Sequence, residues 1–164
     1  MSILAPLVLV LSGTTHVAPA LSEPSPFPLK TPTACTVVTK ADVEQALGRP
    51  VSGGVEHKTA PAQSTCDYTS GDGEITIALV HSGDKLDADE EMRELEKILP
   101  KGAVREATGI GLRAFFLDIP RAGAQLHVLR GEHDYLMISV LGLGGPSEVS
   151  SAAVQIARKA LDRL

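Results

Sequence analysis

Short turns between strand candidates constrain this fold more than any other feature of the sequence. Turns at residues 70–73, 120–123 and 131–134 each separate two strand candidates, and in the candidate at residues 74–81 Ile75, Ile77 and Leu79 alternate with Thr76 and Ala78. Such short connections favour antiparallel pairing, because parallel strands need a crossover of a dozen or more residues. The strand candidates are residues 51–56, 64–69, 74–81, 103–107, 112–119, 124–130 and 135–141.

Three helices are predicted around these strands. Thr39 and Asp42 form a capping-box pattern at the start of the first helix, which Gly48 ends, and Asp87 and Glu90 repeat that pattern before a helix that Pro100 ends. The third helix covers residues 147–164. The expected order α-βββ-α-ββββ-α belongs to the α+β class, an antiparallel sheet with flanking helices. The apolar face of the first helix is expected to be Val43, Ala46 and Leu47, and that of the second Met92, Leu95, Ile98 and Leu99. That of the third is expected to be Val149, Ala152, Ala153, Ile156, Ala160 and Leu164.

The amino-terminal segment has the pattern of an exported protein. An apolar run at residues 3–11 is followed by small residues up to Ala20, which predicts a signal peptide at residues 1–20, although no Lys or Arg precedes the run. The run is shorter than the roughly 20 residues that span a bilayer, so no transmembrane span is expected in the mature chain. The alternative, a buried strand of a cytosolic domain, fits poorly with the Pro-rich stretch that follows.

The Pro-rich stretch at residues 21–33 is interpreted as an extended linker. A single α+β domain is then expected at residues 34–164. Together with the signal pattern, this organisation predicts a periplasmic or secreted bacterial protein.

Cys35 and Cys66 are the only two cysteines of the chain. An even pair in an exported protein normally forms a disulfide. A redox or metal pair is disfavoured, because the two cysteines have no Cys-x-x-Cys spacing and no cluster of histidines beside them. In a cytosolic chain they would instead be ordinary buried thiols.

The chain has the motifs Ala34-Cys35-Thr36, residues 38–43, Leu47-Gly48, Cys66-Asp67-Tyr68, and Gly109-Ile110-Gly111 before Ala114-Phe115-Phe116. These short motifs resemble those of an uncharacterised family of exported bacterial domains, many of them lipoproteins, with a Cys-x-x-x-Thr start and a Gly-x-Gly segment. The resemblance spans roughly residues 34–164, and it implies the same order of helices and strands and an envelope location, without a known activity. Leu112 stands where the family usually has Asp, and the lipidated Cys is absent.

Charge and composition argue against a nucleic-acid partner. The chain has 15 basic and 20 acidic residues, which are scattered and give a net charge of −5. No basic stripe is therefore expected that could neutralise a run of phosphates.

The polar residues predict no metal, cofactor or catalytic site. The histidines lack both the i, i+4 spacing of a helical ligand pair and a His-x-His pair on a strand, and His127 is expected on the sheet surface because it alternates with apolar neighbours. Ser139 lacks a Gly-x-Ser-x-Gly motif, and Gly109 with Gly111 indicates a tight turn. The residues weighed as metal ligands are His57, His81, His127 and His133 with Asp67, Asp84 and Asp134.

One loop is singled out as a possible ligand-binding site. Gly142, Gly144 and Gly145 precede the last helix, whose free amides could accept a small anion or a partner's backbone. A plain turn between strand and helix is the alternative. The sequence as a whole favours a non-catalytic envelope domain that binds a protein or a small ligand, and the alternative is a hydrolase-type enzyme whose site is assembled from distant residues.

Overall fold

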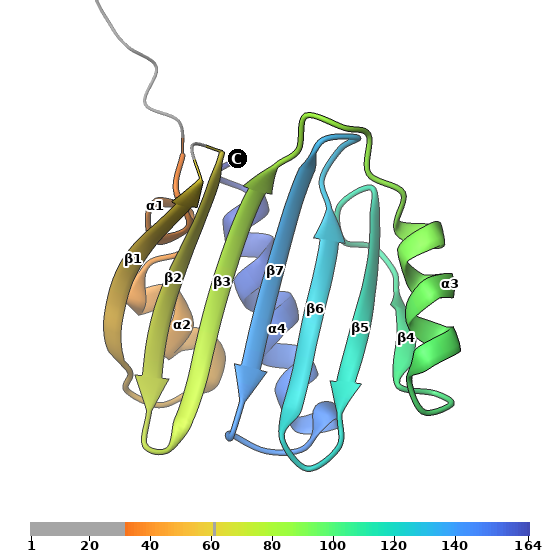
Figure 1. The fold of residues 1–164 in the computed structure, drawn as a ribbon. Helices are drawn as coiled ribbons and strands as arrows, with labels where there is room; N and C mark the ends of the chain where they lie inside the picture. Colours follow the sequence, from red (N-terminus) through yellow and green to blue (C-terminus); the bar gives the residue numbers. More distant parts are fainter. Residues whose placement is uncertain (1–31, 61) are drawn as a thin grey trace, which may run out of the picture. The chain divides into compact units, whose positions relative to one another are not determined.

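The computed structural model describes residues 32–60 and 62–164, so the predicted signal peptide and nearly all of the predicted linker lie outside the described residues. Seven strands form one antiparallel sheet in the order β1-β2-β3-β7-β6-β5-β4 (Figure 1). The strands are β1 (Ser52–Ala60), β2 (Gln63–Ser70), β3 (Gly73–His81), β4 (Val104–Ala107), β5 (Arg113–Ile119), β6 (Gly123–Leu129) and β7 (Asp134–Leu141). The helices are α1 (Ala34–Val37), α2 (Lys40–Leu47), α3 (Ala88–Ile98) and α4 (Pro146–Leu161).

These elements confirm the predicted α+β fold and its order. The Thr39 hydroxyl accepts from the amide of Asp42 at the start of α2, and the Asp87 carboxylate accepts from the amides of Asp89 and Glu90 at the start of α3. Both predicted N-caps were therefore correct, and α2 also has the reciprocal hydrogen bond of a capping box. The short helix α1 was not predicted, because four residues are too few for an amphipathic period.

Glycines occupy the turn of one hairpin and the start of another strand. Gly71, with φ of 58°, lies in the turn of the β2–β3 hairpin, where Ser70 pairs with Gly73. At the start of β6, Gly123 has φ of 141°, and a Cβ atom there would lie 2.0 Å from the carbonyl oxygen of Val140. Only glycine lets β6 approach β7 this closely.

The sheet consists of two groups of sequential strands that meet at β3 and β7. All other neighbouring strands follow one another along the chain, whereas β3 pairs with β7 across α3 and three further strands. Three apolar pairs line this seam in register, namely Ile75 with Val140, Ile77 with Ile138, and Leu79 with Leu136.

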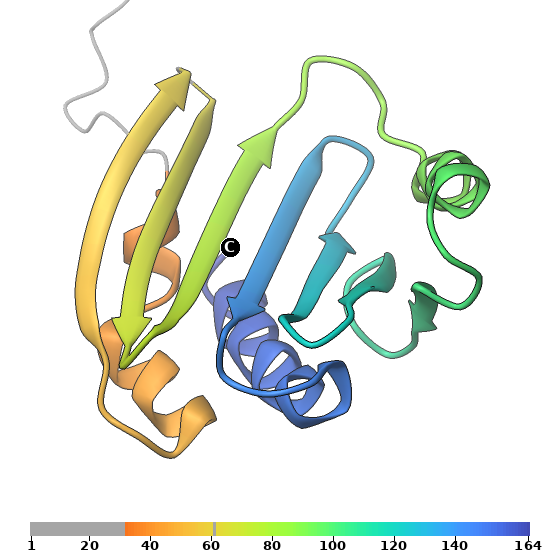
Figure 2. The same ribbon diagram turned by 60° about the horizontal axis from the view of Figure 1, so that its bottom comes forward.

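One face of the sheet, here called the inner face, is covered by α1, α2 and α4 (Figure 2). Side chains alternate along each strand, so every second residue of the strands points into this core. Ile77, Ile138 and Leu126 are fully buried there, together with Ile156 from α4 and Val43 from α2. The main hydrophobic core therefore lies between the inner face and these helices.

The opposite face, here called the outer face, carries only α3 among the described helices, and α3 packs mainly against β4 and β5. A second, smaller core forms there from Ala88, Phe115 and Leu129, with Leu95 partly buried against it. The apolar face predicted for this helix was wrong at Ile98, which is 78% exposed. The edge strand β4 is only four residues long and leaves the last turn of α3 without a surface to cover.

Among the described residues, no helix is long and apolar enough to cross a membrane.

Candidate functional site

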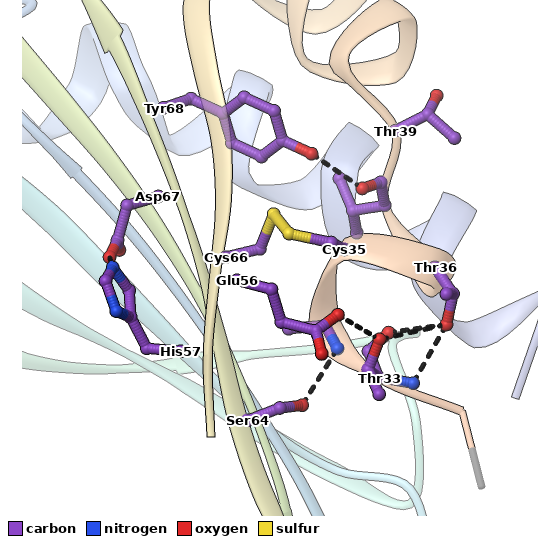
Figure 3. The surroundings of a disulfide bond; sticks show 12 residues. Thr33, Cys35, Thr36, Thr39, Glu56, His57, Ser64, Cys66, Asp67 and Tyr68 are labelled. Atoms are coloured by element: carbon purple, nitrogen blue, oxygen red, sulfur yellow. Dashed lines mark hydrogen bonds and ion pairs between the residues drawn. A yellow bond between two sulfur atoms is a disulfide. The ribbon is translucent and has the colours of Figure 1, made fainter. Parts of the chain in front are cut away.

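Cys35 and Cys66 form the predicted disulfide, which joins α1 to the middle of β2 (Figure 3). Their Cα atoms are 5.0 Å apart, within the usual range for a bridge. The Tyr68 hydroxyl donates to the carbonyl of Val38 at 2.8 Å, so the same strand holds the chain just beyond α1. The disulfide fastens the start of the described domain to the inner face and has a structural role.

A buried carboxylate ties the end of the chain to α2. Arg163 Nη1 lies 2.6 Å from Asp42 Oδ2, and the amide of Thr39 donates to the same oxygen at 2.8 Å. The hydrogen-bonded Arg163 guanidinium holds the pKa of the Asp42 carboxyl well below its usual range. All three groups are used in closing the fold, so this ion pair is structural as well.

The predicted glycine loop lies between β7 and α4. Gly142 and Gly144 have φ of 71° and 144°, and the amide of Gly145 donates to Glu148 Oε2 at 2.6 Å. An incoming anion would therefore have to displace this carboxylate from the helix start. The ligand-binding role of Gly142, Gly144 and Gly145 stays a prediction. A pocket of about 270 Å³ adjoins the loop and is lined by Ala46, Leu47, Arg49, Leu143, Glu148, Val149, Ser151 and Ala152.

A row of polar side chains crosses the outer face from β1 to β6. Thr76 donates to Asp67 Oδ1 at 2.8 Å, and His57 Nε2 lies 3.4 Å from Asp67 Oδ2. Thr76 is also opposite Ser139, which is in turn opposite Gln125. His57, Asp67, Thr76, Ser139 and Gln125 are called the polar row below. Figure 3 shows its His57–Asp67 end on the side of β2 away from the disulfide.

No described helix covers this part of the outer face, in contrast to the inner face (Figures 1 and 2). Ala78, Val80 and Met137 flank the polar row on the same face. Ser139 and Ala78 are almost fully buried within this surface. The exposed part of the surface therefore combines the polar groups of His57, Asp67, Thr76 and Gln125 with the apolar side chains of Val80 and Met137. Sequence reasoning missed it because its members come from five strands and have no fixed spacing along the chain.

His127 lies elsewhere on the outer face, under α3, and only 7% of it is exposed. The expectation of a position on the sheet surface was wrong, because the outer core beneath α3 extends over this part of β6. The ring stacks on Phe115 at 4.6 Å, and its Nδ1 is hydrogen-bonded to the hydroxyl of Tyr135. Burial lowers the pKa of His127 to about 4, so the imidazole is neutral near pH 7.

Glu91 of α3 approaches the same imidazole, with its Oε1 atom 3.9 Å from His127 Nδ1. Burial raises the pKa of the Glu91 carboxyl. Nε2 of His127 is buried and has no hydrogen-bond partner among the described residues. The imidazole is thus a polar group held in an apolar environment, which destabilises its charged form.

The other two described histidines, His81 and His133, lie beside acidic residues at one end of the β3–β7 seam. His81 Nδ1 is 2.8 Å from Asp134 Oδ1, and His133 Nδ1 is 3.2 Å from the carbonyl oxygen of Asp84. The cross-strand register, which pairs His81 with Asp134, brings these residues together. No group of three or more potential metal-ligating side chains occurs within the described part of the chain.

Comparison with protein-family models, curated proteins and solved structures finds no match to this chain.

Proposed function

We propose that this protein is an exported, non-catalytic binding domain of the cell envelope, and that the outer face at β1, β2, β3, β7 and β6 receives a protein partner. One observation carries the proposal. The inner face is covered by three helices, whereas the polar row and its apolar neighbours have no described helix over them.

The size of this surface agrees with a transient partner. Five strands spaced about 4.8 Å apart, each of seven or more residues, give a face of roughly 500 Å². Transient interfaces bury less than about 600 Å² on each partner. A small ligand would instead call for a concave pocket that encloses most of its surface.

Export is supported by the disulfide and by the amino-terminal pattern. Disulfides persist in oxidising compartments and are rare in the cytosol. Cys35 and Cys66 form such a bridge, and residues 1–20 have the pattern of a signal peptide. The resemblance to exported bacterial domains agrees with the same location.

The side-chain arrangement supports binding over the hydrolase alternative. Nδ1 of His127 is engaged by Tyr135, and the hydroxyl of Ser139 lies 3.5 Å from Gln125 Nε2. A hydrolytic serine needs an imidazole within hydrogen-bond reach as its base. The hydrogen bonds of these two side chains serve packing and sheet structure instead.

Site-specific photo-crosslinking tests the binding surface. A photoreactive amino acid would replace Thr65 or Thr76 on the outer face, and the matched control would replace Gln155, an exposed residue of α4. In intact cells that export the chain, we expect a discrete adduct from Thr65 and Thr76 and none from Gln155. Adducts from Gln155 alone, or none from either outer-face position, would contradict the proposal.

Intact mass tests export and the bridge together. Protein recovered from the envelope or medium should begin at Leu21 and should gain two alkyl groups only after reduction. An uncleaved chain whose two thiols alkylate directly would contradict the proposed location.

A further inference from the structure

The histidines at the rim of the β3–β7 seam have the hydrogen bonds that metal-binding histidines have. His81 lies at the end of β3, His133 directly precedes β7, and their ring centroids are 6.2 Å apart. The two chain segments are fixed to one another, because the amide of Ser82 donates to the carbonyl of His133 at 2.8 Å. Two imidazoles from distant parts of the sequence are therefore held side by side.

In both rings the Nδ1 atom lies beside an oxygen. The oxygen belongs to the Asp134 carboxylate for His81, and to the backbone carbonyl of Asp84 for His133. A metal-binding histidine usually donates its second N–H group to a carboxylate or a carbonyl in this way, which leaves the other nitrogen as the ligand. Within the described residues, neither His81 Nε2 nor His133 Nε2 takes part in a hydrogen bond.

The separation of the rings also suits a shared ion. With a bond of about 2.0–2.1 Å from metal to nitrogen, each ring centroid lies roughly 3.2 Å from the ion, so two bound rings are at most about 6.4 Å apart. This limit applies to a linear arrangement, and the observed 6.2 Å lies just below it. A tetrahedral ion needs centroids about 5.2 Å apart, so the two rings must move roughly 1 Å closer to share it. The His81 side chain is 63% exposed, so its ring can turn slightly toward the ion without disturbing the core.

We propose that His81 and His133 bind one divalent transition-metal ion through their Nε2 atoms, with water completing the coordination. Imidazole nitrogen suits Cu²⁺ and Zn²⁺, and Cu²⁺ binds such ligands more tightly.

The charges around the two histidines are mixed. Asp134 and Glu132 are acidic, but Arg130 lies 3.7 Å from Asp134 and Lys85 pairs with Glu132. Selection therefore depends on the two imidazoles rather than on net charge. The site is independent of the partner proposed above.

Titration calorimetry with CuCl₂ and ZnCl₂ tests this site on the exported chain, purified without a histidine tag and with its disulfide intact. We expect one equivalent of bound metal, tighter for Cu²⁺ than for Zn²⁺. For Cu²⁺, the electron paramagnetic resonance spectrum should show coupling to two nitrogen ligands. Absence of stoichiometric binding, or coupling to a single nitrogen, would overturn the proposal.

Three substitutions assign the ligands. His81→Gln and His133→Gln should each weaken binding by more than tenfold and abolish coupling to the second nitrogen. Asp134→Asn keeps both ligands but removes a carboxylate partner, so we expect affinity to fall roughly 10–100-fold. Circular dichroism and thermal unfolding should show that these three variants at the rim remain folded.

His57→Gln is the matched control, because His57 is also exposed and also lies beside an aspartate. It should bind both metals like the original chain. Loss of binding in this control, or unchanged binding in both His81→Gln and His133→Gln, would place the metal elsewhere and overturn the assignment.

Discussion

Replacing His127 with Gln should remove most of the acid sensitivity that its buried imidazole gives to the domain. Burial lowers the pKa of His127 from 6.5 to about 4. Below pH 6.5 the unfolded chain therefore binds a proton that the folded chain does not. The free energy of unfolding should fall as the pH drops from about 6.5 to about 4. The total loss is about 3 kcal/mol, because a tenfold change in proton affinity is worth about 1.4 kcal/mol.

Two titratable groups face His127, and only one interferes with this test. Burial raises the pKa of the Tyr135 hydroxyl, which stays protonated throughout the acidic range. Burial also raises the pKa of Glu91 on α3, so the folded chain takes up a proton there before the unfolded chain does. Glu91 therefore stabilises the folded chain at low pH, and this stabilisation is lost as the pH rises. The effect on the free energy of unfolding is opposite in sign to that of His127. A Glu91→Gln background removes it.

Urea unfolding followed by circular dichroism at pH 7, 6, 5 and 4 measures the effect. In the Glu91→Gln background, the free energy of unfolding should fall by about 3 kcal/mol over this range, and the additional His127→Gln change should leave it nearly level. Gln can still hydrogen-bond the hydroxyl of Tyr135, which limits the loss of packing. If both chains lose the same stability, or if acid stabilises the chain that keeps His127, the imidazole is not held neutral by burial.

Three further predictions concern the elements that close the fold. Replacing Cys35 and Cys66 with Ser should lower the free energy of unfolding by roughly 3.7 kcal/mol, because the bridge joins residues 31 apart; an unchanged urea midpoint would contradict this. Asp42→Asn should lower the free energy of unfolding by about 1–2 kcal/mol at pH 7 in the same assay. The difference from the original chain should shrink as the pH falls below 3.8, because the bond to Arg163 stabilises only the ionised carboxyl. Gly123→Ala should lower the melting temperature through a loss of at least about 2 kcal/mol, whereas Gly83→Ala, whose added Cβ meets no atom within 4 Å, should leave it unchanged. Equal melting temperatures for the two glycine variants would refute the close approach of β6 and β7.

Local patterns predicted the elements well because their causes are local. The turn at residues 70–73 ends one strand and starts the next, and Asp87 caps α3 through its own neighbours. The pairing of β3 with β7 has no such signature. Alternation shows which residues share a face, but it carries no information on which distant strand lies alongside.

The same limit explains what sequence reasoning missed in the sites. Alternation placed His127 on the opposite side of β6 from Leu126, which is correct, but its burial depends on where α3 crosses the sheet. Likewise, the spacing of His81 and His133 along the chain matches no ligand pattern. Only the register of the seam brings them to one rim.

The β3–β7 seam has a consequence for how the domain folds. Every other strand pair closes through a local connection, whereas the seam joins positions 81 and 134. Closing a loop of about 50 residues costs roughly 2 kcal/mol more than closing a hairpin, so we expect the two strand groups to form first and the seam to form last. Until then both β3 and β7 expose an unpaired edge. At high concentration, β3 of one molecule can pair with β7 of another, and refolding should then yield dimers that have exchanged halves.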